Sequence, residues 1–258
     1  MTRRTMCASI LATMIAITPA VRADLAPAGV VRAGVNYGNF ILATRDPTSG
    51  ESRGVAIDLA RELGQRLGVP VSLVGYDSVA VMVDAARTGA WDIAFLGIDP
   101  AREGEIGFTA PFLEIEATYL VPAGSTLGAV GDVDREGVRV AAPARVNYEL
   151  FLGRHLKRAQ LVRAPTAAAA FDLLATGQVD VLAGLRQALI GLSDRLPGAR
   201  VLDGRFMAVQ QAVGVPRGRD AGLAYLRGVV ESAKASGLIT RAIERTGARG
   251  VSVAPSAG

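Results

Sequence analysis

The chain has 258 residues, of which 50% are hydrophobic and 20% charged, with 28 basic residues, 24 acidic residues and a formal net charge of +4. This composition is that of a globular protein that can bury one large core or two smaller ones. Only Lys157 and Lys234 are lysines, and the arginines are scattered among acids rather than gathered in a stripe. We therefore expect no nucleic-acid partner.

The first 23 residues predict an export signal. Arg3 and Arg4 are followed by an apolar run over 10–17 and by the small-residue ending 21–23, directly before Asp24. The run is shorter than the roughly 18 residues of a membrane-spanning helix. We expect cleavage after Ala23 and a mature protein in the periplasm. Arg3-Arg4 leaves a twin-arginine route open beside general export of the unfolded chain.

Cleavage would also change the charge and cysteine content. The three arginines of the signal, Arg3, Arg4 and Arg22, take the basic count from 28 to 25, against 24 acids. Cys7 lies within the signal as well, so the mature chain would contain no cysteine and no disulfide.

A weak internal sequence repeat, called the echo below, predicts the architecture. Residues 84–93, Asp-Ala-Ala-Arg-Thr-Gly-Ala-Trp-Asp-Ile, recur in outline at 172–181 as Asp-Leu-Leu-Ala-Thr-Gly-Gln-Val-Asp-Val. Each copy predicts a helix, a glycine stop and a buried strand, 93–98 in the first copy and 179–183 in the second. The echo predicts two units of the same construction.

The segments before each copy also match in order. Strand 30–35, helix 56–67 and strand 71–74 correspond to strand 138–142, helix 148–156 and strand 160–162. Ser78 and Thr166 are placed to cap the helices that follow. The sequence thus predicts an α/β protein of two lobes, each with a mostly parallel sheet flanked by helices.

Two strands are candidates for crossing between the lobes, 117–124 and 208–215. We expect lobe 1 to comprise 24–120 and 212–258 and lobe 2 to comprise 121–211. Two helices, one beginning at Asp220 and one near 239–245, are assigned to lobe 1. The tail 251–258 contains Pro, Ser and Gly and little to bury, and we expect it to be frayed.

The segments Gly-Val-Ala-Ile-Asp-Leu-Ala at 54–60, Ile-Asp-Pro-Ala-Arg at 98–102 and Phe-Thr-Ala-Pro-Phe at 108–112 resemble the extracellular solute-binding proteins of family 3. That family includes the polar amino-acid-binding components of bacterial ABC importers. The resemblance implies the type II periplasmic-binding-protein fold, in which two hinge strands join the lobes. It also implies a small-molecule ligand in the cleft, no cofactor, and an ABC permease as partner; we expect a monomer.

The resemblance places ligand-binding residues at the ends of strands. In similar proteins the arginine matching Arg102 binds the ligand carboxylate, a task that suits a planar guanidinium, although pairing with a nearby glutamate is an alternative. Gly97 stands where relatives carry Ser or Thr, so only a backbone donor remains there. Asn36 and Asn39 stand where relatives carry an acid and an aromatic, and could equally be turn residues.

Lobe 2 supplies the remaining candidates. Arg145 and Asn147 lie in the strand-to-helix turn that faces the ligand in relatives, where a helix start favours anions. Arg145 would add a full positive charge there, or could equally be a solvated arginine beside Glu149. Leu185, followed by Arg186, stands where amino-acid binders of the family carry an aspartate for the ligand ammonium. A buried ammonium without a carboxylate is costly. The hypothesis is therefore a small carboxylate-bearing ligand, an organic acid or a dicarboxylate, and not necessarily an α-amino acid.

Alternatives to this hypothesis remain at the level of sequence. Glu114 or Glu116 could replace the missing aspartate, or the alignment could be shifted. The same two acids could form a catalytic pair, as in a periplasmic dehydratase of the cyclohexadienyl (prephenate or arogenate) type on this fold. We expect a binding protein and no enzyme, because the chain has no nucleophile elbow and no phosphate-binding loop. His155 is expected to be solvated, and no metal site is predicted.

Overall fold

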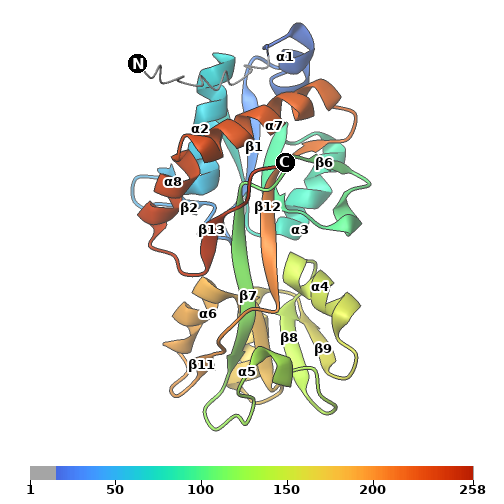
Figure 1. The fold of residues 1–258 in the computed structure, drawn as a ribbon, viewed down its shortest axis with the longest axis vertical. Helices are drawn as coiled ribbons and strands as arrows, with labels where there is room; N and C mark the ends of the chain where they lie inside the picture. The colour runs from blue at the N-terminus through green and yellow to red at the C-terminus, as the bar shows by residue number, and fades with distance from the viewer. Residues whose placement is uncertain (1–15, 258) are drawn as a thin grey trace, which may run out of the picture.

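The computed structural model describes residues 16–257, so Arg3, Arg4, Cys7 and most of the apolar run of the expected signal lie outside the described residues. The chain forms two α/β lobes stacked along the long axis, and two long strands run between them (Figure 1). This arrangement confirms the predicted two-lobed fold.

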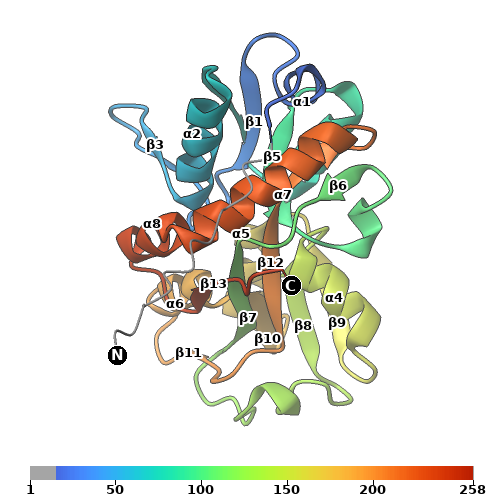
Figure 2. The ribbon, with the colours of Figure 1, turned by 45° about the horizontal axis from the view of Figure 1, so that its top comes forward.

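Lobe 1 is built on parallel strands with the order β4-β1-β5. Its strands are β1 (Val31–Asn36), β4 (Val71–Tyr76), β5 (Ile93–Gly97) and the short β6 (Ile106–Phe108), with a hairpin of β2 (Thr44–Arg45) and β3 (Ser52–Arg53). Its helices are α1 (Pro19–Leu25), α2 (Val55–Leu67), α3 (Val79–Asp84), α7 (Asp220–Ala235) and α8 (Leu238–Thr246), with 3-10 turns η1 (Ala85–Thr88) and η2 (Pro100–Arg102). Figure 2 shows α7 lying across this lobe, where it packs against α1 and α8.

Lobe 2 repeats the parallel arrangement with the order β10-β8-β9. Its strands are β8 (Arg139–Pro143), β9 (Gln160–Ala164), β10 (Val181–Leu185) and the short β11 (Arg200–Val201). Its helices are α4 (Asn147–His155), α5 (Ala167–Ala175) and α6 (Arg186–Ser193), with a 3-10 turn η3 (Val130–Asp132). We did not predict α6, which begins at one of the candidate site residues.

The crossing strands are β7 (Leu113–Val121) and β12 (Met207–Pro216), which pair antiparallel with each other. β12 pairs with β5 of lobe 1, and β7 pairs with β10 of lobe 2, so one mixed sheet of 11 strands continues through both lobes. Each crossing strand runs without a break from one lobe into the other, so no residue marks the point where one lobe ends. The boundaries 24–120, 121–211 and 212–258 therefore stay a prediction.

The local signals of the sequence account for the helices of the echo. The Ser78 and Thr166 hydroxyls accept hydrogen bonds from Val81 N and Ala169 N, the caps that the sequence predicted. Gly89 and Gly177 have φ of 63° and 70°, the left-handed conformation that ends each helical segment.

The echo extends to a repeated ion pair that was not predicted. Asp92, before β5, accepts hydrogen bonds from Arg32 N, Nε and Nη2 at 3.0, 2.9 and 2.7 Å. Asp180, before β10, accepts the same three from Arg139 at 2.8, 3.0 and 3.0 Å. In each lobe the pair fastens the start of the first strand to its neighbour. Asp92 is fully buried and also accepts from Arg219 Nη1 at 2.9 Å, whereas Asp180 is half-exposed.

This difference predicts unequal costs for the same substitution. Asp92→Asn should lower the free energy of unfolding by about 1.5–3 kcal/mol, because the buried carboxylate loses its charge-assisted hydrogen bonds from the partly exposed Arg32 and Arg219. Asp180→Asn should cost no more than about 1 kcal/mol, because its pair is exposed to solvent. Urea unfolding followed by circular dichroism measures both, and equal costs would contradict the prediction.

The pH dependence of stability provides a control. Burial raises the pKa of the Asp92 carboxyl, but hydrogen bonds from Arg32 and Arg219 outweigh burial and hold the pKa below its usual range. The stabilisation is thus complete above the unfolded pKa of about 3.9 and is lost as the pH falls through the lower folded pKa. The stability difference between wild type and Asp92→Asn should narrow below about pH 4.

The expectation of a frayed tail is wrong. Residues Val251–Val253 form β13, which pairs antiparallel with Leu113 and Ile115 of β7. Ala254 is buried, and the Lys234 ammonium donates hydrogen bonds to the carbonyls of Pro111 and Pro255 at 3.2 and 2.8 Å. The alternating Val-Ser-Val pattern was a strand signal that the neighbouring Pro and Gly concealed.

Helix α1 contains the cleavage site expected after Ala23. Thr18 caps the helix, Val21 and Leu25 are buried in the lobe 1 core, and the Asp24 carboxylate accepts from Gly222 N at 2.8 Å. Among residues 16–257, no helix is both long enough and apolar enough to cross a membrane.

Candidate functional site

A cavity of about 100 Å³ lies between the lobes. Five of the predicted site residues line it: Asn36, Asn39 and Gly97 from lobe 1, and Asn147 and Leu185 from lobe 2. Asn36, Gly97 and Leu185 are the last residues of β1, β5 and β10. The carboxyl ends of parallel strands are where open α/β sheets present their ligands, and here the ends of both sheets face one cavity.

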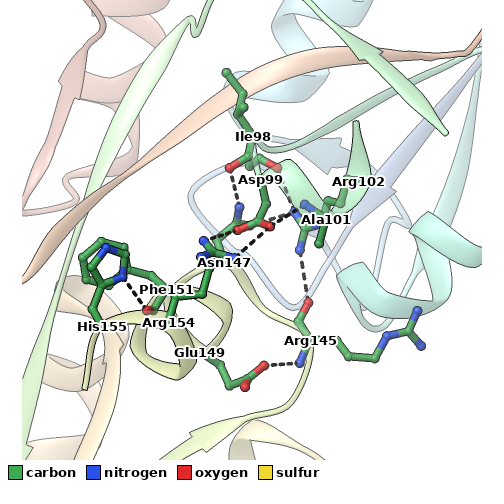
Figure 3. Close-up of polar contacts among 11 residues, drawn as sticks. Ile98, Asp99, Ala101, Arg102, Arg145, Asn147, Glu149, Phe151, Arg154 and His155 are labelled. Carbon is green, nitrogen blue, oxygen red and sulfur yellow. Dashed lines mark hydrogen bonds and ion pairs between the residues drawn. The ribbon is translucent and has the colours of Figure 1, made fainter. Parts of the chain in front are cut away.

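Arg102 lies in η2, just beyond β5, and its guanidinium reaches across to lobe 2 (Figure 3). Nη1 donates to the Gly97 carbonyl at 2.7 Å and to Asn147 Oδ1 at 2.8 Å, and Nη2 donates to the Arg145 carbonyl at 3.1 Å. The acceptors of Arg102 thus belong to three other predicted site residues, Gly97, Asn147 and Arg145. The geometry brings together Arg102, Gly97, Asn147 and the main chain of Arg145.

The acceptors of Arg102 are all uncharged oxygens. The side chain is 4% exposed, and burial lowers the pKa of its guanidinium to about 10, while nearby Asp99 opposes that shift. Arg102 therefore stays protonated at neutral pH. Within the described part of the chain no carboxylate lies within ion-pair distance of it. A buried cation held by neutral dipoles alone retains a strong preference for an anion.

Two ion pairs join the lobes beside Arg102. Asp84, the last residue of α3, accepts from Arg145 Nη1 and Nη2 at 2.9 and 2.6 Å. Asp99 caps η2 by accepting a hydrogen bond from Ala101 N, and it also accepts from Arg154 Nη2 at 2.9 Å. The hydrogen bond from Arg145 holds the pKa of Asp84 below its usual range. The Arg145 guanidinium thus faces Asp84 at the edge of the interface instead of the cavity.

Arg145 also has an unusual backbone. Its φ is 64°, the left-handed region, and among the described residues it is the one non-glycine with a positive φ. Its N–H donates to Glu149 Oε2 at 2.8 Å, and buried Glu149 accepts from Arg163 Nε at 2.7 Å. These contacts hold the turn so that the Arg145 carbonyl points at Arg102.

The backbone of Arg145 supports a matched pair of substitutions. Arg145→Gly and Arg145→Ala both remove the exposed ion pair with Asp84, which contributes at most about 1 kcal/mol. Only glycine adopts the left-handed conformation without a steric penalty of about 1–2 kcal/mol. Arg145→Gly should therefore be more stable than Arg145→Ala by about 1 kcal/mol in urea unfolding. Equal stabilities would show that this φ carries no strain.

Arg186 lies away from the cavity. Its Nε donates to Glu116 Oε2 at 2.6 Å and its Nη1 donates to the Leu202 carbonyl at 3.3 Å. Glu116 is thus paired, and neither it nor Glu114 lines the cavity. Leu185, which precedes Arg186, presents an apolar side chain where the family resemblance predicted an ammonium-binding aspartate in relatives.

Sequence analysis missed two polar groups of the cavity. Gln211 of β12 is 4% exposed and lines the cavity, as does Tyr148 of α4. Gln211 Oε1 and Asn39 Oδ1 are buried without a hydrogen-bond partner among the described residues. Burial raises the pKa of the Tyr148 phenol, so it stays neutral. Gln211 precedes the apolar run 212–215, and a buried glutamine in a crossing strand was the signal available.

Comparison with known proteins identifies the family. Residues 31–247 match the bacterial extracellular solute-binding proteins, family 3. The chain belongs to that family. The match includes both lobes, both crossing strands and every predicted site residue.

Individual relatives are distant. The ABC transporter glutamine-binding protein GlnH of Bacillus subtilis is 22% identical over 192 residues, which are 73% of this chain and 70% of GlnH. The periplasmic VFT2 domain of BvgS from Bordetella pertussis has a TM-score of 0.74 at 21% identity, covering 89% of this chain and 98% of that domain. The substrate-binding protein AbpA of Streptococcus pneumoniae, bound to L-arginine, has a TM-score of 0.71 at 20% identity, covering 86% and 95%. At these identities the solved structures support the fold.

Proposed function

We propose that this protein is the exported solute-binding component of an ABC importer, and that its lobes close on a small polar ligand whose carboxylate binds Arg102. Membership in the solute-binding family supports the binding role. The names of the relatives, an ABC transporter glutamine-binding protein and an amino-acid ABC transporter substrate-binding protein, support the import system and a permease partner.

The observation that carries the ligand assignment is the environment of Arg102. Its guanidinium is buried at the interface of the lobes, remains charged at neutral pH and meets only neutral acceptors. A carboxylate can accept two parallel hydrogen bonds from a guanidinium and supplies the missing charge. An anionic group of the ligand is therefore the partner that this site favours.

Arg102 does not itself line the cavity, but it donates hydrogen bonds to Gly97 and Asn147, which do. The described residues that line the cavity are all uncharged. Its polar side chains are the amides of Asn36, Asn39, Asn147 and Gln211 and the phenol of Tyr148. The unpartnered oxygens of Asn39 and Gln211 favour ligand groups that donate hydrogen bonds, such as hydroxyls or amides. Because the described residues that line the cavity include no acidic side chain, an α-ammonium would have no charged partner among them. We infer a small organic acid, or an amino acid held without an ionic contact to its ammonium.

The catalytic alternative gains no support from this geometry. Glu114 and Glu116, the acids weighed as a catalytic pair, do not line the cavity, and Glu116 is paired with Arg186. We therefore propose a binding protein, and its monomeric state stays a prediction.

Arg102→Ala tests the ligand assignment. Mature protein from Asp24 onward is screened by thermal shift against organic acids and amino acids, and a hit is titrated by calorimetry. We expect Arg102→Ala to weaken binding of a carboxylate at least tenfold, about 1.4 kcal/mol, because a charge-assisted hydrogen-bond pair is lost. Arg139→Ala removes an arginine from an ion pair remote from the cavity and should leave the affinity unchanged. Equal stabilisation of wild type and Arg102→Ala by the same ligand would refute the anchor.

The processing site is tested by the mass of the exported protein. We expect the mature chain to begin at Asp24, which keeps the Asp24 contact with Gly222 and the buried Leu25 in place. Cleavage there removes Pro19–Ala23 from α1 and with it the buried Val21. Intact-mass spectrometry of the periplasmic fraction gives the first residue. A mature chain that begins at or before Thr18 would contradict the predicted site and would show that α1 is retained whole.

A further inference from the structure

We propose that Asn147 is an internal occupant of the Arg102 anion site, which holds the lobes closed before any ligand binds. This inference goes beyond the proposed function, because it concerns closure by the chain's own groups. With Arg102 as the ligand anchor, a part that rests on the proposed function, Asn147 also determines which ligands compete successfully for Arg102.

The amide of Asn147 bonds across the cleft through both of its polar atoms. Oδ1 accepts from Arg102 Nη1 at 2.8 Å, and Nδ2 donates to the Ile98 carbonyl at 2.8 Å (Figure 3). The side chain comes from lobe 2 and both of its partners belong to lobe 1. At 6% exposed it is buried in the interface rather than solvated at the start of α4. Its oxygen thus takes a position on Arg102 that a ligand carboxylate would take.

Gly97 makes the room for this amide. A Cβ atom built at Gly97 would lie 2.4 Å from Asn147 Oδ1, 2.5 Å from its Cγ and 2.7 Å from its Nδ2. Any side chain at this position would collide with the whole amide group. Because two hydrogen bonds to lobe 1 hold the amide, it cannot turn aside without breaking them. The glycine and the asparagine are therefore parts of one arrangement.

The surrounding contacts favour the same closed state. The Arg145 carbonyl accepts from Arg102 Nη2 at 3.1 Å, and the ion pairs Asp84–Arg145 and Asp99–Arg154 join the lobes on either side. Every one of these contacts is lost when the lobes separate. A ligand shifts an equilibrium only by its difference in affinity for the two states. Here a carboxylate must displace the Asn147 amide from Arg102 before it gains that contact.

The distance between the lobes tests this proposal on ligand-free protein. The mature chain lacks cysteine once Cys7 is removed, so Gln65→Cys on α2 and Asp172→Cys on α5, both exposed, can carry spin labels. The protein is first unfolded in urea, dialysed and refolded without carboxylate buffers, so that any ligand carried over from expression is removed. The distance between the two spin labels is then measured by double electron–electron resonance. We expect a single short distance in wild type. Asn147→Ala and Gly97→Ala should each shift the mean distance to a longer value, beyond the width of the wild-type distribution.

A double-mutant cycle and a control variant distinguish loss of the Asn147 contacts across the cleft from nonspecific destabilisation of the fold. Gly97→Ala with Asn147→Ala should give the same distance as Asn147→Ala alone, because the collision requires both side chains. Arg139→Ala, which breaks an ion pair with Asp180 inside lobe 2 and away from the cavity, should keep the wild-type distance. Far-ultraviolet circular dichroism of each variant establishes that it is folded.

Two outcomes overturn the proposal. One is a ligand-free wild type whose distance equals that of Asn147→Ala. The other is a Gly97→Ala variant that is folded and as closed as wild type. Neither outcome depends on any ligand, so failure here leaves the binding proposal and its Arg102→Ala test standing. Failure of that test would leave the closure by Asn147 standing and remove only its effect on ligand competition.

Discussion

A buried guanidinium cannot remain without acceptors, and that requirement determines how the two lobes meet. Arg102 takes one carbonyl from its own lobe and two oxygens from the other lobe. Removing a charge from water costs several kcal/mol unless its donors are satisfied, so separating the lobes must expose Arg102 to water or to a ligand. For this reason the same hydrogen bonds of Arg102 form both the candidate site and the interface between the lobes.

The rest of the fold positions the partners of Arg102. In each lobe an aspartate before the third strand of the repeat is paired with an arginine at the start of the first strand. These pairs fix the far ends of the sheets, and the carboxyl ends of β1, β5, β8 and β10 then converge on the cleft. The crossing strands β7 and β12 keep the two sheets in register through a shared ladder of hydrogen bonds. Glu149 completes the arrangement by holding the Arg145 turn.

The sequence predicted the elements because their signals are local. Capping residues, glycine stops and apolar runs defined most of the strands and helices of both lobes, and the echo at 84–93 and 172–181 gave their common order. Pairings between distant residues were not predictable in this way. Nothing near Asn147 in the sequence indicates that its amide enters the space left by Gly97, fifty residues earlier. The partners Asp84 and Arg154, and the exposure of Gln211 to the cavity, likewise depend on how the lobes meet in three dimensions.

The C-terminal strand β13 has a mechanical consequence for the joint between the lobes. It pairs with Leu113 and Ile115, and the Glu116 N–H donates to the Gly250 carbonyl, so the lobe 1 half of β7 is bound along both edges. From Ala117 onward the partner on that edge is β10 of lobe 2 instead. We expect β7 to bend most readily in the short span between Glu116 and Ala117, where its partner on that edge changes. By pairing with β7, the C-terminal strand β13 stiffens the lobe 1 part of this crossing strand and so determines where the strand can bend.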